Sequence, residues 1–135
     1  EIEEQLTLAA GIPVVIQFTP HLIPVNRGIL TTLYLAPGEP FNDAAGATKF
    51  GEQVAACYAA AYANEPFVRL LEGKALPDTK NVVGTNVCEI AWRLDPRTGR
   101  LIVMSAEDNL VKGAGGQAVQ SMNLRCSLPE TAGLL

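Results

Sequence analysis

Apolar residues recur at helical spacing over the second quarter of the chain. They stand at i, i+4, i+7, i+8, i+11 and i+12, which predicts one face of a helix packed against a core. Asn42 or Asp43 can cap the start of this helix, and it ends at about Asn64. The residues on the apolar face are Phe50, Val54, Cys57, Tyr58, Ala61 and Tyr62.

Two further helices are expected, one near each end of the chain. Residues 1–10 carry apolar side chains at helical spacing, and a glycine follows them. Asp108 or Asn109 can cap the other helix, which runs to about Leu124. Three of the first four residues are acidic, which is unlike a secretory signal and indicates a cut inside a longer protein.

Five segments rich in β-branched and apolar residues predict β-strands. Two of them flank Asp95-Pro96-Arg97-Thr98-Gly99, a turn sequence typical of a hairpin. Together with the helices they predict one α+β domain over residues 1–135, with a mainly antiparallel sheet and helices on one face. The predicted strands are 12–19, 29–36, 67–71, 81–94 and 100–106.

The chain carries fewer charges than a soluble domain of its length usually does. Charged residues make up 18% of the 135 residues, against about 25% in typical domains. No apolar run approaches the ~20 residues of a membrane span, and a net charge of −4 argues against nucleic-acid binding. We therefore expect neither a membrane nor a nucleic acid as partner. We expect instead an apolar face hidden against another protein surface, so that the domain is not a monomer.

Three cysteines and one histidine are too few and too widely spaced for a metal site. Cys57, Cys88 and Cys126 form no CxxC pair, and zinc usually takes about four Cys or His ligands. An odd number of thiols also gives no disulfide framework. We expect no bound metal, and unpaired thiols suit a reducing cytoplasm.

His21 is the only histidine and the first candidate for chemistry. It lies in a loop stiffened by Pro20 and Pro24, six residues before Arg27. Histidine is the commonest general acid or base near neutral pH, and an arginine can fork onto a carboxylate or a phosphate. The alternative is a partly exposed surface histidine, and the residues alone leave both open.

Two glycine-containing segments interrupt the predicted elements. Three glycines between residues 113 and 116 fall in the first turns of the last helix, where each costs about 1 kcal/mol relative to alanine. Either a ligand approaches the slim backbone there, or another element packs tightly against it. Gly84, followed by Thr85 and Asn86, falls inside a predicted strand and indicates a bulge or a close approach.

Six short segments are the most distinctive of the chain: FTPHLIPVNRGIL at 18–30, EPFV at 65–68, GTN at 84–86, DNLVKG at 108–113, QAVQSMNL at 117–124 and LPET at 128–131. In this order they closely resemble the N-acetyl-gamma-glutamyl-phosphate reductase family. The resemblance covers nearly the whole chain. The segments after residue 108 are also similar to the aspartate-semialdehyde dehydrogenases, which share the architecture.

The resemblance implies a two-domain, NADP-dependent reductase of arginine biosynthesis, which converts N-acetyl-glutamyl 5-phosphate to the 5-semialdehyde. An N-terminal Rossmann domain would bind the cofactor. This chain would be the C-terminal domain, with a glyceraldehyde-3-phosphate-dehydrogenase-like fold, substrate contacts and the interface of a homo-oligomer. The family's nucleophilic cysteine lies in an NPGCY-like motif upstream of the matched segments, so these residues alone are expected to be inactive.

The same resemblance implies residue roles. His21 matches the base that holds the cysteine as a thiolate and then protonates the oxygen of the collapsing hemithioacetal. The other implied contacts are Arg27, Thr85 and Asn86 to the acyl-phosphate substrate, and Asn109 and Gly113 to NADP.

Two alternatives stay open. Val83 stands where the family usually has arginine, and Glu107 stands where it usually has an apolar residue. A diverged substrate is therefore one alternative, namely the carrier-protein-bound aminoadipyl phosphate of lysine biosynthesis. The other is that this chain is a non-catalytic dimerisation or binding module.

Overall fold

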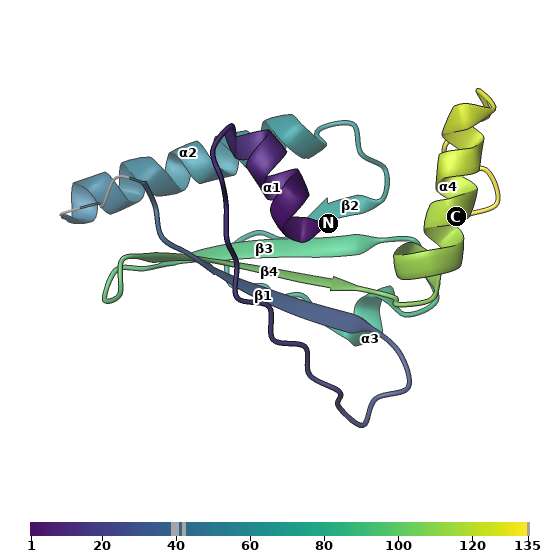
Figure 1. Cartoon of the computed structure of the whole chain (residues 1–135), viewed down its shortest axis with the longest axis horizontal. Coiled ribbons are helices and arrows are strands. Elements are labelled where there is room, and N and C mark those ends of the chain that lie inside the picture. The colour runs from purple at the N-terminus through teal and green to yellow at the C-terminus, as the bar shows by residue number, and fades with distance from the viewer. Residues whose placement is uncertain (39–40, 42, 135) are drawn as a thin grey trace.

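A sheet forms the centre of the domain in the computed structural model, which describes residues 1–38, 41 and 43–134. Within these residues the sheet has four strands in the order β1-β4-β3-β2 (Figure 1). The β1–β4 and β3–β4 pairs are antiparallel, whereas β2 and β3 are parallel. The predicted α+β class with a mainly antiparallel sheet is confirmed. The strands are β1 (Ile29–Leu35), β2 (Val68–Leu70), β3 (Cys88–Asp95) and β4 (Arg100–Glu107).

One long helix, α2 (Ala44–Tyr62), lies along one face of this sheet (Figure 1). The predicted cap is Asp43, whose Oδ1 accepts a hydrogen bond from the Gly46 N–H at 2.7 Å, while Asn42 lies outside the described residues. Val54 of α2 packs against two residues of β4 that lie two positions apart and therefore share one face of the strand. The core around Val54 consists of Leu101 and Val103, with Phe50, Tyr58, Ile90, Trp92 and Leu94 packed against it.

The segment 12–19, predicted as a strand, is not one. Its backbone bonds to α1 (Ile2–Ala10) instead of to the sheet: the Val14 N–H donates to the Thr7 hydroxyl at 3.0 Å, and the Ile16 N–H to Glu3 Oε1 at 2.9 Å. Residues 15 and 18 have relative exposures of 87% and 69%. β-branched residues favour an extended backbone, but a strand also needs a neighbouring strand, and within the described residues this segment has none.

The strand predicted over 81–94 is wrong in its first half. A short helix, α3 (Thr79–Val82), forms there because Asp78 caps it, accepting a hydrogen bond from the Lys80 N–H at 3.0 Å. Gly84 then turns the chain with a φ of 79°, a left-handed conformation that favours glycine. The strand β3 starts only at Cys88. The described residues hold four strands and not the five expected, because segment 12–19 is not a strand.

The last predicted helix is confirmed in its extent but differs in its first turn. A π-helix, η1 (Val111–Gly115), precedes α4 (Gly116–Arg125), which stands at one end of the sheet (Figure 1). The N–H groups of Gly113 and Gly115 donate to carbonyls five residues back, both at 2.9 Å. Short π-helical turns are rare and often mark functional sites.

Candidate functional site

The carboxylate of Asp108 joins separate parts of the chain at the start of η1. Its Oδ1 accepts hydrogen bonds from the N–H groups of Leu110 at 2.7 Å and Val111 at 2.8 Å, and its Oδ2 accepts one from the Gly84 N–H at 2.8 Å. The side chain is fully buried. These donors, Gly84 foremost, together with the charge of Arg27, hold the pKa of Asp108 below its usual range. A fixed negative charge therefore lies beneath the start of the last helix.

Arg27 brings a positive charge from the loop before β1 to this carboxylate. Its Nη1 lies 3.5 Å from Asp108 Oδ1, and its side chain keeps 35% exposure. The next residue is tied as well, because the Gly28 N–H donates to Asn109 Oδ1 at 2.8 Å. Two consecutive residues at the start of the last helix therefore hold two consecutive residues of the loop. The structure thus brings Arg27 and Asn109, both predicted site residues, into one cluster.

Thr85 and Asn86 follow Gly84 in the turn before β3. The Thr85 hydroxyl donates to the Val82 carbonyl at 2.8 Å and accepts a hydrogen bond from the Val87 N–H at 3.2 Å. Asn86 is 1% exposed, and its Nδ2 donates to an α4 side chain. Both side chains therefore bond within the protein and shape the turn that brings Gly84 to the cluster.

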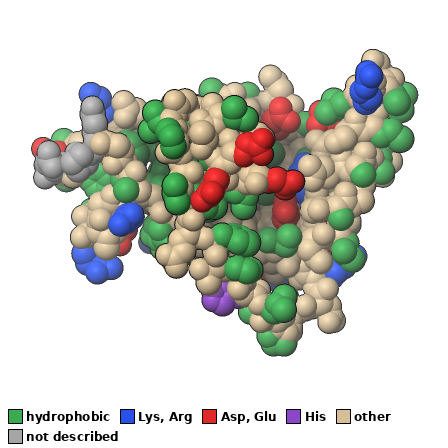
Figure 2. All heavy atoms as spheres, in the orientation of Figure 1, with side chains coloured by type: hydrophobic (Ala, Val, Ile, Leu, Met, Phe, Trp, Pro, Cys, Tyr) green, Lys and Arg blue, Asp and Glu red, His purple; other side chains and the backbone are tan. Residues whose placement is uncertain are grey.

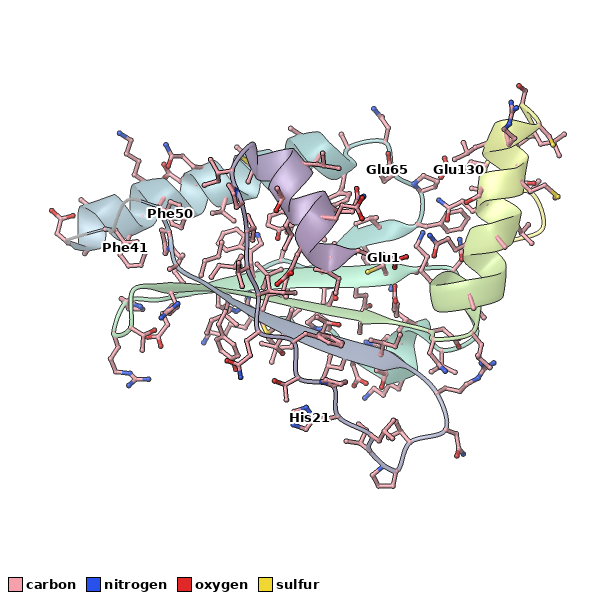
Figure 3. The ribbon with its side chains drawn as sticks, in the orientation of Figure 1. Glu1, His21, Phe41, Phe50, Glu65 and Glu130 are labelled. Atoms are coloured by element: carbon pink, nitrogen blue, oxygen red, sulfur yellow. The ribbon has the colours of Figure 1, made fainter. Side chains whose placement is uncertain are left out.

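Gln120 of α4 accepts that hydrogen bond from Asn86 and connects a second polar network. Its Oε1 also accepts a bond from Lys112 Nζ at 2.8 Å, and its Nε2 donates to Glu130 Oε1 at 2.6 Å. Glu130 lies beside α4 in Figure 3. Lys112 Nζ also lies 5.7 Å from the centroid of the Phe67 ring. The network holds η1, α4 and the segment after α4 together.

His21 lies apart from these contacts. Its ring is exposed, at the lower edge of the molecule in Figures 2 and 3, and its Nδ1 lies 3.1 Å from the Thr19 carbonyl oxygen. Among the described residues it makes no hydrogen bond to Arg27 or to Asp108. The structure therefore presents His21 to solvent and joins it to the cluster only through the loop that carries both His21 and Arg27.

Cys88 and Glu107 stand opposite each other in the register of β3 and β4. Burial raises the pKa of the Cys88 thiol, and the nearby Glu107 charge raises it further, while Lys112 opposes both. Burial also raises the pKa of Glu107, and Lys112 again opposes the effect. A thiol with a raised pKa is a poor nucleophile at neutral pH, in contrast to catalytic cysteines.

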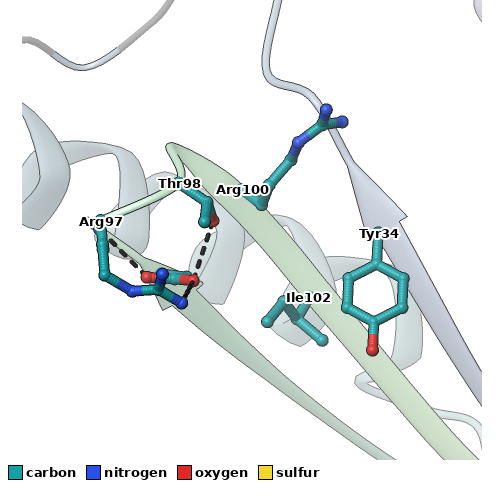
Figure 4. A pocket seen from close by; sticks show the side chains of 6 residues that line it. Tyr34, Arg97, Thr98, Arg100 and Ile102 are labelled. Atoms are coloured by element: carbon teal, nitrogen blue, oxygen red, sulfur yellow. Dashed lines mark hydrogen bonds and ion pairs between the residues drawn. The ribbon is translucent and has the colours of Figure 1, made fainter.

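An open hollow of about 600 Å³ lies at the β3–β4 hairpin (Figure 4). Its rim is polar, because Asp95 accepts hydrogen bonds from the Arg97 N–H and the Thr98 hydroxyl. The hollow is lined by Tyr34, Asp95, Arg97, Thr98, Arg100 and Ile102, none of which is a predicted site residue. In the part of the chain that the structure describes, no group of three or more His, Cys, Asp or Glu residues could hold a metal ion. No helix there is long and apolar enough to cross a membrane.

Two residues of these networks were missed from the sequence. Asp108 was expected only as a helix cap, and Gln120 was not expected at all. The signal for Asp108 was its position directly before a glycine-rich helix start. Its partner Gly84 lies 24 positions away, so sequence spacing could not reveal the contact.

Comparison with known proteins shows the family of the chain. Residues 1–109 match the model of the semialdehyde dehydrogenase dimerisation domain. Over 134 residues, 99% of the chain, it is 54% identical to the N-acetyl-gamma-glutamyl-phosphate reductases of Geobacter sp. (strain M21) and Citrifermentans bemidjiense. It is 51% identical over 99% of its length to the reductase of the same name from Alkaliphilus metalliredigens. The chain spans 36% of the length of each of these relatives. The resemblance stated from the sequence is confirmed, and the chain belongs to the semialdehyde dehydrogenase dimerisation-domain family.

Proposed function

We propose that this chain is the substrate-binding and dimerisation part of an NADPH-dependent N-acetyl-gamma-glutamyl-phosphate reductase of arginine biosynthesis, acting in the cytoplasm. The observation that carries the proposal is the 54% identity over 99% of the chain to reductases of that name. The reaction consumes the acyl phosphate, NADPH and a proton, and it releases the semialdehyde, NADP and phosphate. A Rossmann domain and the nucleophilic cysteine of the same enzyme belong to this proposal, since the chain spans 36% of those relatives.

His21 is the general base of the proposed reaction. The Thr19 carbonyl oxygen can only accept, so Nδ1 at 3.1 Å must donate, which leaves Nε2 of the neutral ring as the acceptor. Nε2 takes the proton of the cysteine thiol as the thiol attacks the acyl phosphate. Phosphate leaves, and after hydride transfer to the thioester the imidazolium protonates the oxyanion of the hemithioacetal. Nε2 takes that proton back as the hemithioacetal collapses to the semialdehyde and the cysteine thiolate. The exposure of the ring supports this role, because the cysteine must reach it from outside the described residues.

Asn109 and Gly113 are proposed to contact the nicotinamide end of NADP, which supplies the hydride. Residues 113–115 are exposed and carry no side chain larger than a methyl group, so a flat ring can approach their backbone closely. Asn109 Oδ1 is bonded to the Gly28 N–H. Its amide nitrogen has no hydrogen-bond partner among the described residues and can donate to a carboxamide oxygen. The exposed backbone at residues 113–115 and the Asn109 amide therefore fit the nicotinamide end of NADP.

The substrate contacts are proposed at Arg27 and in the turn after Gly84, both of which meet Asp108. Arg27 meets an anionic group of the acyl phosphate, because a guanidinium can fork onto two oxygens. Thr85 and Asn86 are the other proposed contacts. The Thr85 hydroxyl bonds within its turn and Asn86 Nδ2 bonds to α4, whereas Asn86 Oδ1 is buried without a hydrogen-bond partner among the described residues. The relatives' names do not favour the aminoadipyl alternative, although Val83 is exposed at the position where the family usually has arginine.

The test is a hybrid reductase, in which the 134 matched residues of this chain replace the corresponding residues of the Geobacter sp. (strain M21) enzyme. We expect the hybrid to reduce N-acetyl-glutamyl phosphate with NADPH. The variant His21→Asn should lower kcat by roughly 100-fold or more, since general bases contribute about 10²–10⁴-fold.

The matched control is Asn26→Ala, an exposed change in the same loop that should leave kcat within about threefold of the hybrid. A loss of less than tenfold in His21→Asn would contradict the role of base. A folded hybrid with no turnover would contradict the function itself. The isolated 135-residue chain, given NADPH and substrate, should show no turnover.

A further inference from the structure

Arg27 combines partial exposure with an unused hydrogen-bond donor. Its side chain is 35% exposed as a whole, yet its Nη1 is buried and has no hydrogen-bond partner among the described residues. A buried donor without a partner costs roughly 1–3 kcal/mol, so such groups usually meet a water or a ligand. The 3.5 Å separation from Asp108 Oδ1 is an ion-pair distance and not a hydrogen bond.

Asp108 cannot readily supply the missing bond. Its Oδ1 already accepts two backbone N–H groups, and its Oδ2 accepts the Gly84 N–H at 2.8 Å. Bonds to both oxygens fix the carboxylate in place, so it cannot turn toward the guanidinium. It therefore attracts Arg27 by charge alone and leaves the donors of Arg27 available.

The backbone at Arg27 is fixed by a second, independent contact. The Gly28 N–H donates to Asn109 Oδ1 at 2.8 Å, and Gly28 has a φ of 101°. A side chain at Gly28 would also lie within 2.7 Å of Thr79, so the loop has little freedom there. Asp108 therefore holds the guanidinium of Arg27, and Asn109 holds the backbone that follows it.

We propose that Asp108 is a positioning residue that presents Arg27 to an oxyanion of the substrate, either a carboxylate or a phosphate. This inference rests on the proposed reductase function. Asp108 partly neutralises the arginine and sets where its planar fork lies, and the fork then donates to two oxygens of the anion. Asp108 itself touches no substrate atom, because it is fully buried.

The experiment uses the hybrid reductase in the oxidative direction, with NADP, the semialdehyde and inorganic phosphate as reactants. The semialdehyde carries the carboxylate, and the phosphate is a separate reactant, so the two anions have separate KM values. We expect Asp108→Asn and Arg27→Gln to raise the same one of these two KM values by at least tenfold. The other KM and kcat should change by less than threefold, and the affected KM identifies the anion.

The double variant separates positioning from a merely structural role. If Asp108 acts through Arg27, adding Asp108→Asn to Arg27→Gln raises the affected KM no further. The control is Asp95→Asn, which removes a carboxylate that also accepts a backbone N–H and lies 3.6 Å from an arginine, at the distant hairpin. It should leave both KM values unchanged.

Two outcomes overturn the inference: both KM values unchanged in Asp108→Asn, or effects that multiply in the double variant. If Asp108→Asn does not fold, Asp108→Glu is measured instead, because it keeps the buried charge but changes where that charge holds Arg27. A raised KM for the same anion as in Arg27→Gln supports the inference, and an unchanged KM overturns it. A folded hybrid without reductase activity overturns the proposed function, whereas an active hybrid whose Asp108→Asn variant keeps both KM values overturns only the role of Asp108.

Discussion

Asp108 is a buried carboxylate whose ionised form is bonded at both oxygens. The hydrogen bond from Gly84, those from Val111 and Leu110, and the charge of Arg27 lower its pKa in the folded chain. In the unfolded chain an aspartate has a pKa of about 3.9. The folded state therefore binds this proton less tightly, and the ionised carboxylate stabilises the fold. That contribution is fully present above about pH 4 and is lost as the pH falls through the lowered pKa.

The predicted consequence is a pH-dependent difference between the hybrid reductase and its Asp108→Asn variant. At pH 7 the variant should unfold at a lower urea concentration, because breaking a buried network at one partner costs roughly 1–3 kcal/mol. Urea midpoints measured between pH 2 and 7 should start to converge below about pH 4, where the unfolded aspartate binds a proton, and should meet only below the lowered pKa of the native carboxylate. Curves that stay parallel over the whole range would contradict the assignment. Asp95→Asn is the control outside the cluster. The hydrogen bond from the Thr98 hydroxyl also lowers the pKa of Asp95, but this carboxylate is at a surface turn, so its variant should differ less from the unchanged hybrid at pH 7.

Two glycines at the junction of η1 and α4 differ in how tightly they are packed. One has no room for a side chain, and the other has room for a methyl group. Gly116 is buried, and a Cβ there would overlap the side-chain oxygen of Asn86 and lie 2.8 Å from the Val111 carbonyl oxygen. Gly115 is exposed and helical, with φ −64°, and its Cβ would meet only the Leu110 carbonyl, at 3.4 Å. Tight packing, one of the two explanations that the sequence left open, therefore accounts for Gly116.

Opposite effects are predicted for two alanine substitutions in the hybrid reductase. Gly116→Ala should destabilise it by roughly 1–3 kcal/mol, because an added methyl group must displace Asn86 or widen the turn. Gly115→Ala should be neutral or stabilising by up to about 1 kcal/mol, because alanine favours a helix over glycine. Thermal melting of both variants checks the pair. Equal effects at the two positions would show that the contact with Asn86 does not constrain the junction.

The sheet has a second face that α2 does not cover. Leu30 and Tyr34 of β1 point to it by strand alternation, opposite Ala106 and Ile102 of β4, and they are 60% and 69% exposed. The core around Val54 lies on the other face. We propose that copies of the chain associate through the sheet, because apolar side chains are exposed on this face at β1, and the matched family is a dimerisation domain.

The predicted state of the isolated 135-residue chain is therefore an oligomer. Sedimentation should give a mass of at least twice 14.3 kDa, and the variant Tyr34→Glu should shift it toward 14.3 kDa by placing a charge on the open face. Leu8→Glu is the control, because Leu8 is also exposed, at 71%, but lies on α1. A single 14.3 kDa species for the unchanged chain would contradict association through the sheet.

The sequence pointed to several residues of the candidate site but not to the contacts that join them. Arg27 and Asn109 were identified from residue type and motif, and the structure brings them together through Asp108 and Gly28. The roles of these two residues, like those of His21, Thr85, Asn86 and Gly113, stay predictions, because contacts within the chain do not show which ligand a side chain binds. The contacts of Asp108 were not predicted, because one of them comes from a turn at Gly84 in a segment that was predicted as a strand.

The sequence alone was sufficient for the α+β class, the long helix α2, the β3–β4 hairpin and the family, because these depend on local periodicity, caps, turn residues and motifs. Only the tertiary structure decided three other features. The segment 12–19 bonds to α1 and not to a strand, β2 runs parallel to β3, and the last helix starts as a π turn over Asp108. The first two depend on which groups elsewhere in the chain meet a given N–H or carbonyl, and the π turn depends on carbonyls five residues back instead of four. That pairing follows from the packing of the whole chain and leaves little trace in the spacing of its residues.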